Sequence, residues 1–202
     1  LKEMAKGMDA AAPDRVRAAA LMKTGRILYS IGDDEGATAQ FKACRDLALD
    51  LQKANPRDGQ ARDLLCQAYS GLGNLAARAG RSWEASANFN REAGCAKDWL
   101  DDEPDNPAAR ERLAESYDWL AGDTPSAIGP AASEDYNKRL LALVEPWSKA
   151  DPKNPIARYY RAAALNGCGR IRTAKGDPVG ARDCFLQSKA LMDGLIAESP
   201  NE

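Results

Sequence analysis

Histidine is absent from the 202 residues of this chain. Because histidine is the commonest general base and metal ligand near neutral pH, its absence excludes catalytic sites of the Ser-His-Asp and Cys-His types and zinc sites built on histidine. The phosphate-binding motif G-x-x-x-x-G-K-[ST] is also absent, and the glycine-containing stretch 71–76 lies inside a helical pattern instead of following a strand. We therefore expect no enzymatic activity, no cofactor and no bound metal ion.

Charge of one sign and long apolar runs are also scarce. The formal net charge is −2, without a dense basic stretch, which argues against nucleic acid as a partner. No apolar run approaches the roughly 18–20 residues of a membrane span, and no signal peptide opens the chain. These absences predict a cytoplasmic protein that does not bind membranes. The chain begins with Leu1, so we expect it to be a piece of a longer protein.

Cysteine is present in an odd number and without any C-x-x-C pair, which argues against a disulfide framework or a zinc site. Each cysteine stands where a small apolar residue would fit a helix. We therefore expect reduced thiols packed in a helical core. The five cysteines are Cys44, Cys66, Cys95, Cys168 and Cys184.

The main positive signal is an internal repeat of 48 residues, which indicates a tandem array of four units. Equivalent positions of the four units, 48 residues apart, form columns of similar residues. One column holds the proline that ends each unit, a second holds a small residue, and a third holds an aromatic residue. In the third unit the aromatic residue, Tyr136, is one place out of register. The columns are Pro56, Pro104, Pro152 and Pro200; Gly25, Gly73, Ala121 and Gly169; and Phe41, Phe89 and Phe185.

Each unit is predicted to contain two helices. In the second unit apolar residues recur at helical spacing until Gly80, and Ser82 is then expected to cap a second helix. Trp83, Phe89 and Trp99 should be mostly buried in that helix. Asn-Pro and Asp-Pro pairs predict helix starts at 106–107, 154–155 and 177–178, and Gly32, Gly80 and Gly176 are suited to left-handed helix ends.

The order of these columns resembles the tetratricopeptide repeat. The matching residues are Leu21, Gly25, Leu28, Ala37, Phe41 and Cys44 in the first unit; Tyr69, Leu72, Gly73, Ala76, Ala85 and Phe89 in the second; and Leu165, Gly169, Ala181 and Phe185 in the fourth. The resemblance implies an all-α, right-handed α-solenoid of four helix-turn-helix units, at about 13–56, 57–104, 105–152 and 153–200, with 1–12 as a tail or cap. The family's usual unit has about 34 residues, so both helices should be longer here.

The resemblance also implies a concave groove lined by the first helix of each unit, and hence a scaffold for protein or peptide partners. Arg and Asn side chains there would suit an acidic peptide or a C-terminal carboxylate. The alternative is a solvated face whose charges are incidental. The groove residues expected to bind are Arg26, Tyr29, Gln67, Asn74, Arg78, Asn166 and Arg170; further groove positions are Met22, Ser30, Ser70, Glu115, Asp118 and Thr173.

Two other functions remain open from the sequence. Repeats of this Ala/Arg/Asp-rich type resemble those attached to bacterial kinases, ATPases and caspase-like proteases, so the chain could be a regulatory or sensor arm of a larger signalling enzyme. A third alternative is self-association through the exposed ends of the array.

Two further features carry structural expectations. Arg62, Arg110 and Arg158 recur near the start of each first helix, where we expect ion pairs with the acidic end of the previous unit or packing of the arginine stems. The stretch 119–130 interrupts the third unit with two prolines. Its first helix should therefore stop near Ala121 or Gly122, and the next should begin near 131–133.

Overall fold

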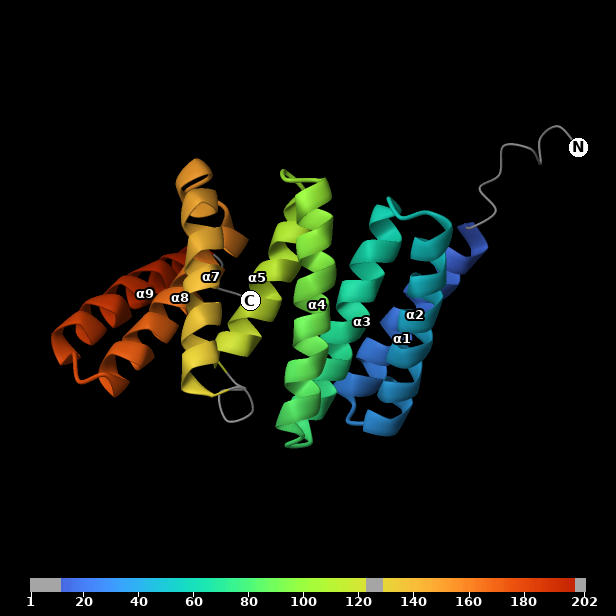
Figure 1. The fold of residues 1–202 in the computed structure, drawn as a ribbon, viewed down its shortest axis with the longest axis horizontal. Coiled ribbons are helices and arrows are strands. Elements are labelled where there is room, and N and C mark those ends of the chain that lie inside the picture. The colour runs from blue at the N-terminus through green and yellow to red at the C-terminus, as the bar shows by residue number, and fades with distance from the viewer. Residues whose placement is uncertain (1–11, 123–128, 199–202) are drawn as a thin grey trace, which may run out of the picture. The chain divides into compact units, whose positions relative to one another are not determined.

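The computed structural model describes residues 12–122 and 129–198, which form eight α-helices (Figure 1). The all-α fold class predicted from the sequence is confirmed for these residues. The helices are α1 (Ala12–Ser30), α2 (Asp34–Ala54), α3 (Gly59–Arg78), α4 (Ser82–Asp102), α5 (Pro107–Gly122), α7 (Pro130–Ala150), α8 (Pro155–Ala174) and α9 (Pro178–Glu198).

Eight helices follow one another in antiparallel order, and most neighbours within a compact unit pack together, as expected for a helical repeat. The chain divides into two compact units, Leu1–Arg112 and Leu113–Glu202, and each is described by itself. In the first unit α2 packs against both α1 and α3, α3 packs against α4, and α1 also touches α3 directly. In the second unit α8 packs against both α7 and α9.

The helix ends follow from local chemistry. Gly32, Gly80 and Gly176 have φ angles of +83°, +70° and +76°, which confirms the predicted left-handed ends. The side-chain oxygens of Asn106, Asn154 and Asp177 accept backbone N–H groups of the helices that they precede, as expected for N-caps. The prediction for Ser82 is wrong. It is the first helical residue of α4, and the N-cap position is Arg81, whose side chain makes no capping bond.

The two helices of a unit approach closely because an aromatic ring lies over a glycine. A β-carbon on Gly25 would lie 2.6 Å from the ring of Phe41, and one on Gly73 would lie 2.7 Å from the ring of Phe89. A β-carbon on Gly169 would lie 2.5 Å from the ring of Phe185. Since real β-carbons do not approach so closely, glycine is required at these positions for the observed helix spacing. The glycine and aromatic columns are thus packing positions.

The third unit departs from this pattern because the residue in the aromatic column is an asparagine. Asn137, which stands in the exact 48-residue register, is only 4% exposed, whereas Tyr136 is partly exposed. Asn137 takes the place of the aromatic ring, and its side-chain oxygen lies directly against Gly167 of α8. The ring of Tyr136 instead packs beside Tyr117, with 5.8 Å between the ring centroids. Helical phase, and not residue type, decides which of two consecutive side chains points inward.

The expected burial of the aromatic residues in α4 is only partly confirmed. Phe89 and Trp99 are buried, but Trp83 is 75% exposed. Trp83 occupies the first turn of α4, where the buried side of the helix is taken by Ala85 and Ser86. Its indole ring therefore remains outside the core.

Two members of the arginine column, Arg62 and Arg158, make ion pairs, but with different partners than expected. The third, Arg110, donates from Nη2 to the Pro104 carbonyl at 2.6 Å. Arg62 pairs with Asp102 and donates from Nε to the Pro56 carbonyl at 2.8 Å. Arg158 pairs with Glu198 at 2.5 Å. Both carboxylates lie 40 residues later, at the end of the second helix of the same unit and not of the previous one. The reason is geometric, because an antiparallel second helix returns to the level at which the first helix began.

The break in the third unit is placed as predicted. The segment 123–128 lies outside the described residues, α5 ends at Gly122, and α7 begins at Pro130, one residue before the expected start. The hydroxyl of Ser133 donates to the carbonyl of Ala121 at 2.5 Å and so ties the start of α7 to the end of α5. Within the described ranges, no helix is both long and apolar enough to cross a bilayer.

The glycine contacts predict opposite effects for the same substitution at two sites. Gly73→Ala should lower the free energy of unfolding by about 1–3 kcal/mol, because its methyl group would collide with the Phe89 ring. Gly94→Ala in α4 is the control, since nothing lies within 4 Å of its β-carbon position, and it should stabilise the helix by about 0.5–1 kcal/mol. Chemical denaturation measures both, and equal effects would contradict the packing role of Gly73.

Candidate functional site

A hollow of about 620 Å³ opens between α1 and α3, the first helices of the two repeats in the first compact unit. Four of the predicted groove positions line it, two of them among the residues expected to bind. Direct packing of α1 against α3 brings these residues together from positions about 40 residues apart in the chain. The lining residues are Ala19, Met22, Lys23, Arg26, Ile27, Ser30, Leu64 and Gln67.

The hollow has an apolar floor. Met22 and Leu64 are 4% and 5% exposed and belong to the hydrophobic core of this unit, and Ile27 adds an apolar side chain that is 54% exposed. The prediction of Met22 as a groove residue therefore needs refinement, since it supports the floor from the core. A partner with an apolar side chain would find contact area at this floor.

The rim of the hollow is cationic. Lys23 and Arg26 are exposed, and the lining contains no carboxylate to balance their two charges. Within the part of the chain that the structure describes, neither cation has an ion-pair partner. An unpaired guanidinium beside an apolar floor can bind a carboxylate with two parallel hydrogen bonds.

Gln67 lies at the edge of the hollow in an ordered polar chain. Its side-chain nitrogen donates to Asp63 Oδ2 at 2.7 Å, and Arg112 Nε donates to Asp63 Oδ1 at 2.9 Å. The carboxylate of Asp63 thus accepts hydrogen bonds on both oxygens. This arrangement fixes the orientation of the Gln67 amide in α3.

Asn74 and Ser70 lie further along α3 and outside the hollow lining. Ser70 is buried, which removes it from the set of surface residues predicted for the groove. Asn74 is half-buried, and its side-chain oxygen Oδ1 is inaccessible to solvent and without a hydrogen-bond partner among the described residues. A buried oxygen of this kind is a strong acceptor for any N–H group that reaches it.

Tyr29 and Arg78, both predicted groove residues, bind each other. The Arg78 guanidinium lies over the Tyr29 ring, 3.9 Å from its centroid, and its Nη1 donates to the Tyr29 carbonyl at 3.1 Å. Arg78 also pairs with Asp34 at the start of α2. Since these contacts occupy the guanidinium, a ligand would have to compete with Asp34 for it.

In the second compact unit the predicted residues lie on α5 and α8. Asn166 and Arg170 are exposed and one helical turn apart on α8, and Arg170 reaches the end of α5 beside Gly122. Tyr159 on α8 is 46% exposed, so its ring faces outward. Burial raises the pKa of Tyr159, and the carboxylates of Asp118 and Glu115 raise it further, so both acids lie near this ring.

Thr173 lies elsewhere. Its hydroxyl donates to the Gly169 carbonyl at 2.9 Å within α8, and its side chain lines a separate hollow with residues of α9. It therefore does not share a site with Asn166.

Four lining residues were not predicted from the sequence, namely Ala19, Lys23, Ile27 and Leu64. The signal was available, because Lys23 and Ile27 lie one turn apart on the same face of α1 as the predicted Arg26 and Ser30. The groove positions were predicted from their distance to the glycine column, and this rule does not include the neighbouring residues of the same helical turn.

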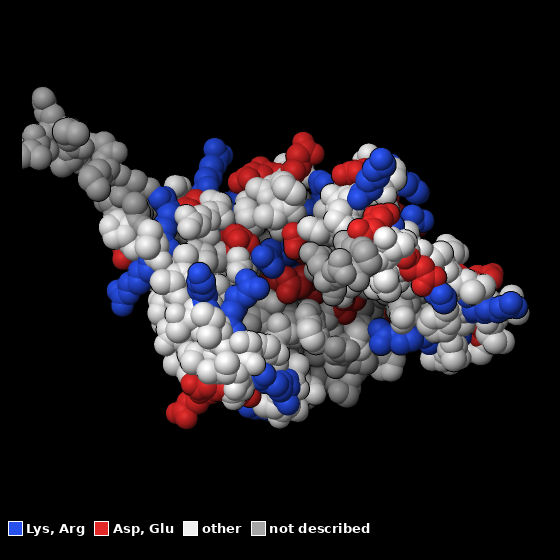
Figure 2. Space-filling model, turned by 180° about the vertical axis from the view of Figure 1, so that it is seen from behind, with Lys and Arg blue, Asp and Glu red and all other residues white. Residues whose placement is uncertain are grey.

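On the side of the molecule drawn in Figure 2, basic and acidic side chains are interspersed among neutral ones. Among residues 12–122 and 129–198, no group of three or more Cys, Asp or Glu side chains converges to hold a metal ion.

All five cysteines are free thiols. Burial raises the pKa of Cys44 to about 11, and burial together with the nearby carboxylates of Asp98 and Glu92 raises the pKa of Cys95 to about 11. Cys168 and Cys184 lie side by side across α8 and α9, with 3.1 Å between their sulfur atoms. Because the thiolate is the nucleophile, Cys44 and Cys95 should react slowly near neutral pH.

Comparison with known proteins adds no family. No protein-family model matches the chain, and no curated protein matches its sequence. The resemblance to a known repeat therefore depends on the columns of the repeat itself.

The raised pKa of Cys95 predicts a pH-dependent reaction. Its side chain is partly exposed, so iodoacetamide can reach it, but at pH 8 a rise from 9.0 to about 11 leaves roughly a hundredfold less thiolate than an ordinary thiol. The alkylation rate should rise about tenfold per pH unit up to pH 11. Mass spectrometry of the peptide that contains Cys95 measures it, with denatured protein as the fast control. Equal rates in folded and denatured protein would contradict the shift.

Proposed function

We propose that this protein is a protein-interaction scaffold of the tetratricopeptide type, which binds an acidic segment or a peptide C-terminus through the first helices of its repeats. The observation that carries the proposal is the hollow between α1 and α3, in which Lys23 and Arg26 stand unpaired above an apolar floor. The column of Arg26 contains the polar residues Asn74 and Arg170, whereas that of Lys23 contains Gly71 and Gly167, which pack against Phe41 and Asn137.

The chemistry of the hollow favours a peptide that carries both a negative charge and an apolar side chain. Arg26 can bind a carboxylate with two hydrogen bonds, while Lys23 contributes a second positive charge one turn away. The floor formed by Met22, Leu64 and Ile27 offers contact to an apolar side chain next to the carboxylate. Together these groups suit a C-terminal residue with an aliphatic side chain.

The groups of α3 extend the proposed site along the peptide. Gln67, held in place by Asp63, offers its amide to the peptide backbone, whereas the Asn74 oxygen is inaccessible to solvent and lies outside the hollow. Arg78 remains engaged with Tyr29 and Asp34, so in this proposal it stabilises the turn between α1 and α2 and does not contact the ligand.

Asn166 and Arg170 form a second contact surface of the same kind on α8. Both are exposed and one turn apart, and Arg170 has a full positive charge without an ion-pair partner among the described residues. The scaffold proposal assigns a further anionic stretch of the partner to this pair.

The test begins with a display library of random peptides that have free C-terminal carboxylates. Selected peptides are then measured by fluorescence anisotropy against the wild-type chain. Arg26→Glu should weaken binding by about tenfold or more, because a charge-assisted, bidentate contact is replaced by repulsion. Amidation of the peptide C-terminus should produce a loss of similar size. The double variant with Arg26→Glu and Arg170→Glu should abolish capture.

The matched control is Lys42→Glu in α2, which makes the same kind of charge reversal at an exposed position outside the hollow. It should leave binding unchanged, and circular dichroism should show the same helicity and melting for all variants. If Arg26→Glu binds the selected peptides as tightly as Lys42→Glu does, the groove assignment is wrong.

A further inference from the structure

The last helix, α9, has two opposite faces. Ala181, Cys184 and Ser188 are buried against α8. Positions two residues earlier point to the far side, since each residue advances about 100° around a helix. Along that far side every residue of one stripe is exposed, and the spacing alternates between three and four residues. The stripe consists of Val179, Arg182, Leu186, Lys189, Asp193 and Ile196.

This stripe is more apolar than the repeat requires. Val179, Leu186 and Ile196 are 72%, 53% and 63% exposed. Three periods earlier, the same columns of α2 contain Glu35, Lys42 and Gln52, and two periods earlier those of α4 contain Trp83, Asn90 and Leu100. Since the repeat tolerates polar residues there, its own packing does not explain the three apolar side chains of α9. Alternation of three and four residues is the pattern by which two helices pack along a seam.

The order of residues in the stripe is self-complementary. Consider two copies of α9 that run antiparallel about a two-fold axis between residues 187 and 188. Each residue of the stripe then lies at the level of the residue of the second copy that is equally far from this midpoint on its other side. Val179 then faces Ile196 of the second copy, and Leu186 faces the aliphatic stem of Lys189. Arg182 faces Asp193 of the second copy. Apolar residues therefore meet apolar groups, and opposite charges meet.

We propose that α9 is a dimer interface, in which the stripe packs antiparallel against the same stripe of a second copy of this chain. A two-fold interface uses one surface twice, so the two Arg182–Asp193 contacts and the two Val179–Ile196 contacts follow from a single arrangement. The proposal is independent of the peptide groove, because it uses a helix that contributes nothing to the hollow between α1 and α3.

The charges of the stripe are available for this contact. Arg182 has no ion-pair partner within the described ranges. Asp193 pairs with Lys189 of its own helix at 2.5 Å, but both side chains are more than half exposed, so this pair is weak. In the dimer the Asp193 carboxylate would accept from Arg182 of the second copy as well as from its own Lys189.

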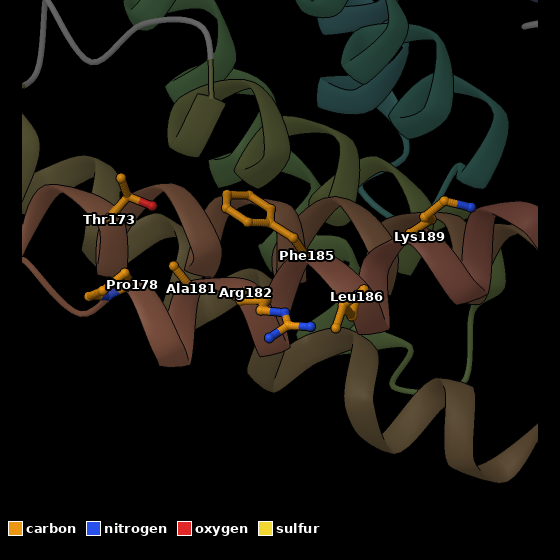
Figure 3. A pocket seen from close by; sticks show the side chains of 7 residues that line it. All are labelled: Thr173, Pro178, Ala181, Arg182, Phe185, Leu186 and Lys189. Carbon is orange, nitrogen blue, oxygen red and sulfur yellow. The ribbon is translucent and has the colours of Figure 1, made fainter.

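The edge of the stripe is hollowed, as Figure 3 shows around Phe185, Arg182 and Leu186. The hollow has a volume of about 350 Å³, and the Phe185 ring in it is 38% exposed. Phe41 and Phe89 occupy the same column and are 2% and 0% exposed.

Charge reversal tests the register directly. Arg182→Asp places a carboxylate opposite Asp193 of the second copy, and Asp193→Arg places a guanidinium opposite Arg182, so each variant alone should dimerise at least roughly tenfold more weakly than wild type. An equimolar mixture of the two variants should form a mixed dimer, because both facing pairs are then of opposite charge. The doubly reversed variant should recover the wild-type dimer for the same reason.

Sedimentation velocity over a range of concentrations measures dimer formation by the wild-type chain, the two single variants, their mixture and the doubly reversed variant. The matched control is Asp183→Arg, which makes the same change on α9 at an exposed residue outside the stripe and should dimerise as wild type does. Circular dichroism checks that each variant is folded. A wild-type chain that stays monomeric at every concentration overturns the proposal. A dimer that survives both single reversals, or a mixture that remains monomeric, overturns it as well.

Discussion

The contact on which the rest of the structure depends is a phenylalanine ring lying over a glycine of the preceding helix. It sets the distance between α1 and α2, between α3 and α4, and between α8 and α9. The ring of Phe41 also lies against Gly71, so one side chain fixes the spacing to the helices on both sides of α2. Because helix pairs at this distance leave an apolar face for the next helix, stability comes from stacking. Where Asn137 replaces the ring, the preceding helix has Ala121 in place of glycine, as expected when a smaller side chain leaves room for a β-carbon.

Groups that could act on other molecules are those that the stacking does not use. The arginines of the unit starts, Arg62 and Arg158, bind carboxylates of their own unit, and Arg78 binds Tyr29 and Asp34. Their guanidinium groups hold helix ends together. Arg26 and Arg182 have the same chemistry but no such partner within the described residues. The first stands over a hollow and the second on an outward stripe, and these are the two places from which we derive interactions.

Most of the helical architecture could be predicted from the sequence, because the signals involved are local. Gly32, Gly80 and Gly176 end helices by their own conformational freedom, and Asn154 caps α8 with an atom three residues away. The 48-residue period then places each helix. The prediction was wrong where it depended on what covers a surface, as for the exposed Trp83, and only helix phase decided that Asn137 fills the aromatic column of the third unit.

The candidate site was predictable only in part. The sequence alone determined an all-α array, the positions of its helix ends, and the face of α1 that contains Arg26, since all three follow from periodicity and short-range hydrogen bonding. Tertiary structure decided which of the polar residues are occupied. Antiparallel helices bring together side chains that are 40 or more residues apart. This packing decides whether Arg78 faces a ligand or Tyr29, and whether Ser70 is exposed. It also decides whether Asp102 lies beside Arg62. No short-range pattern encodes that distance.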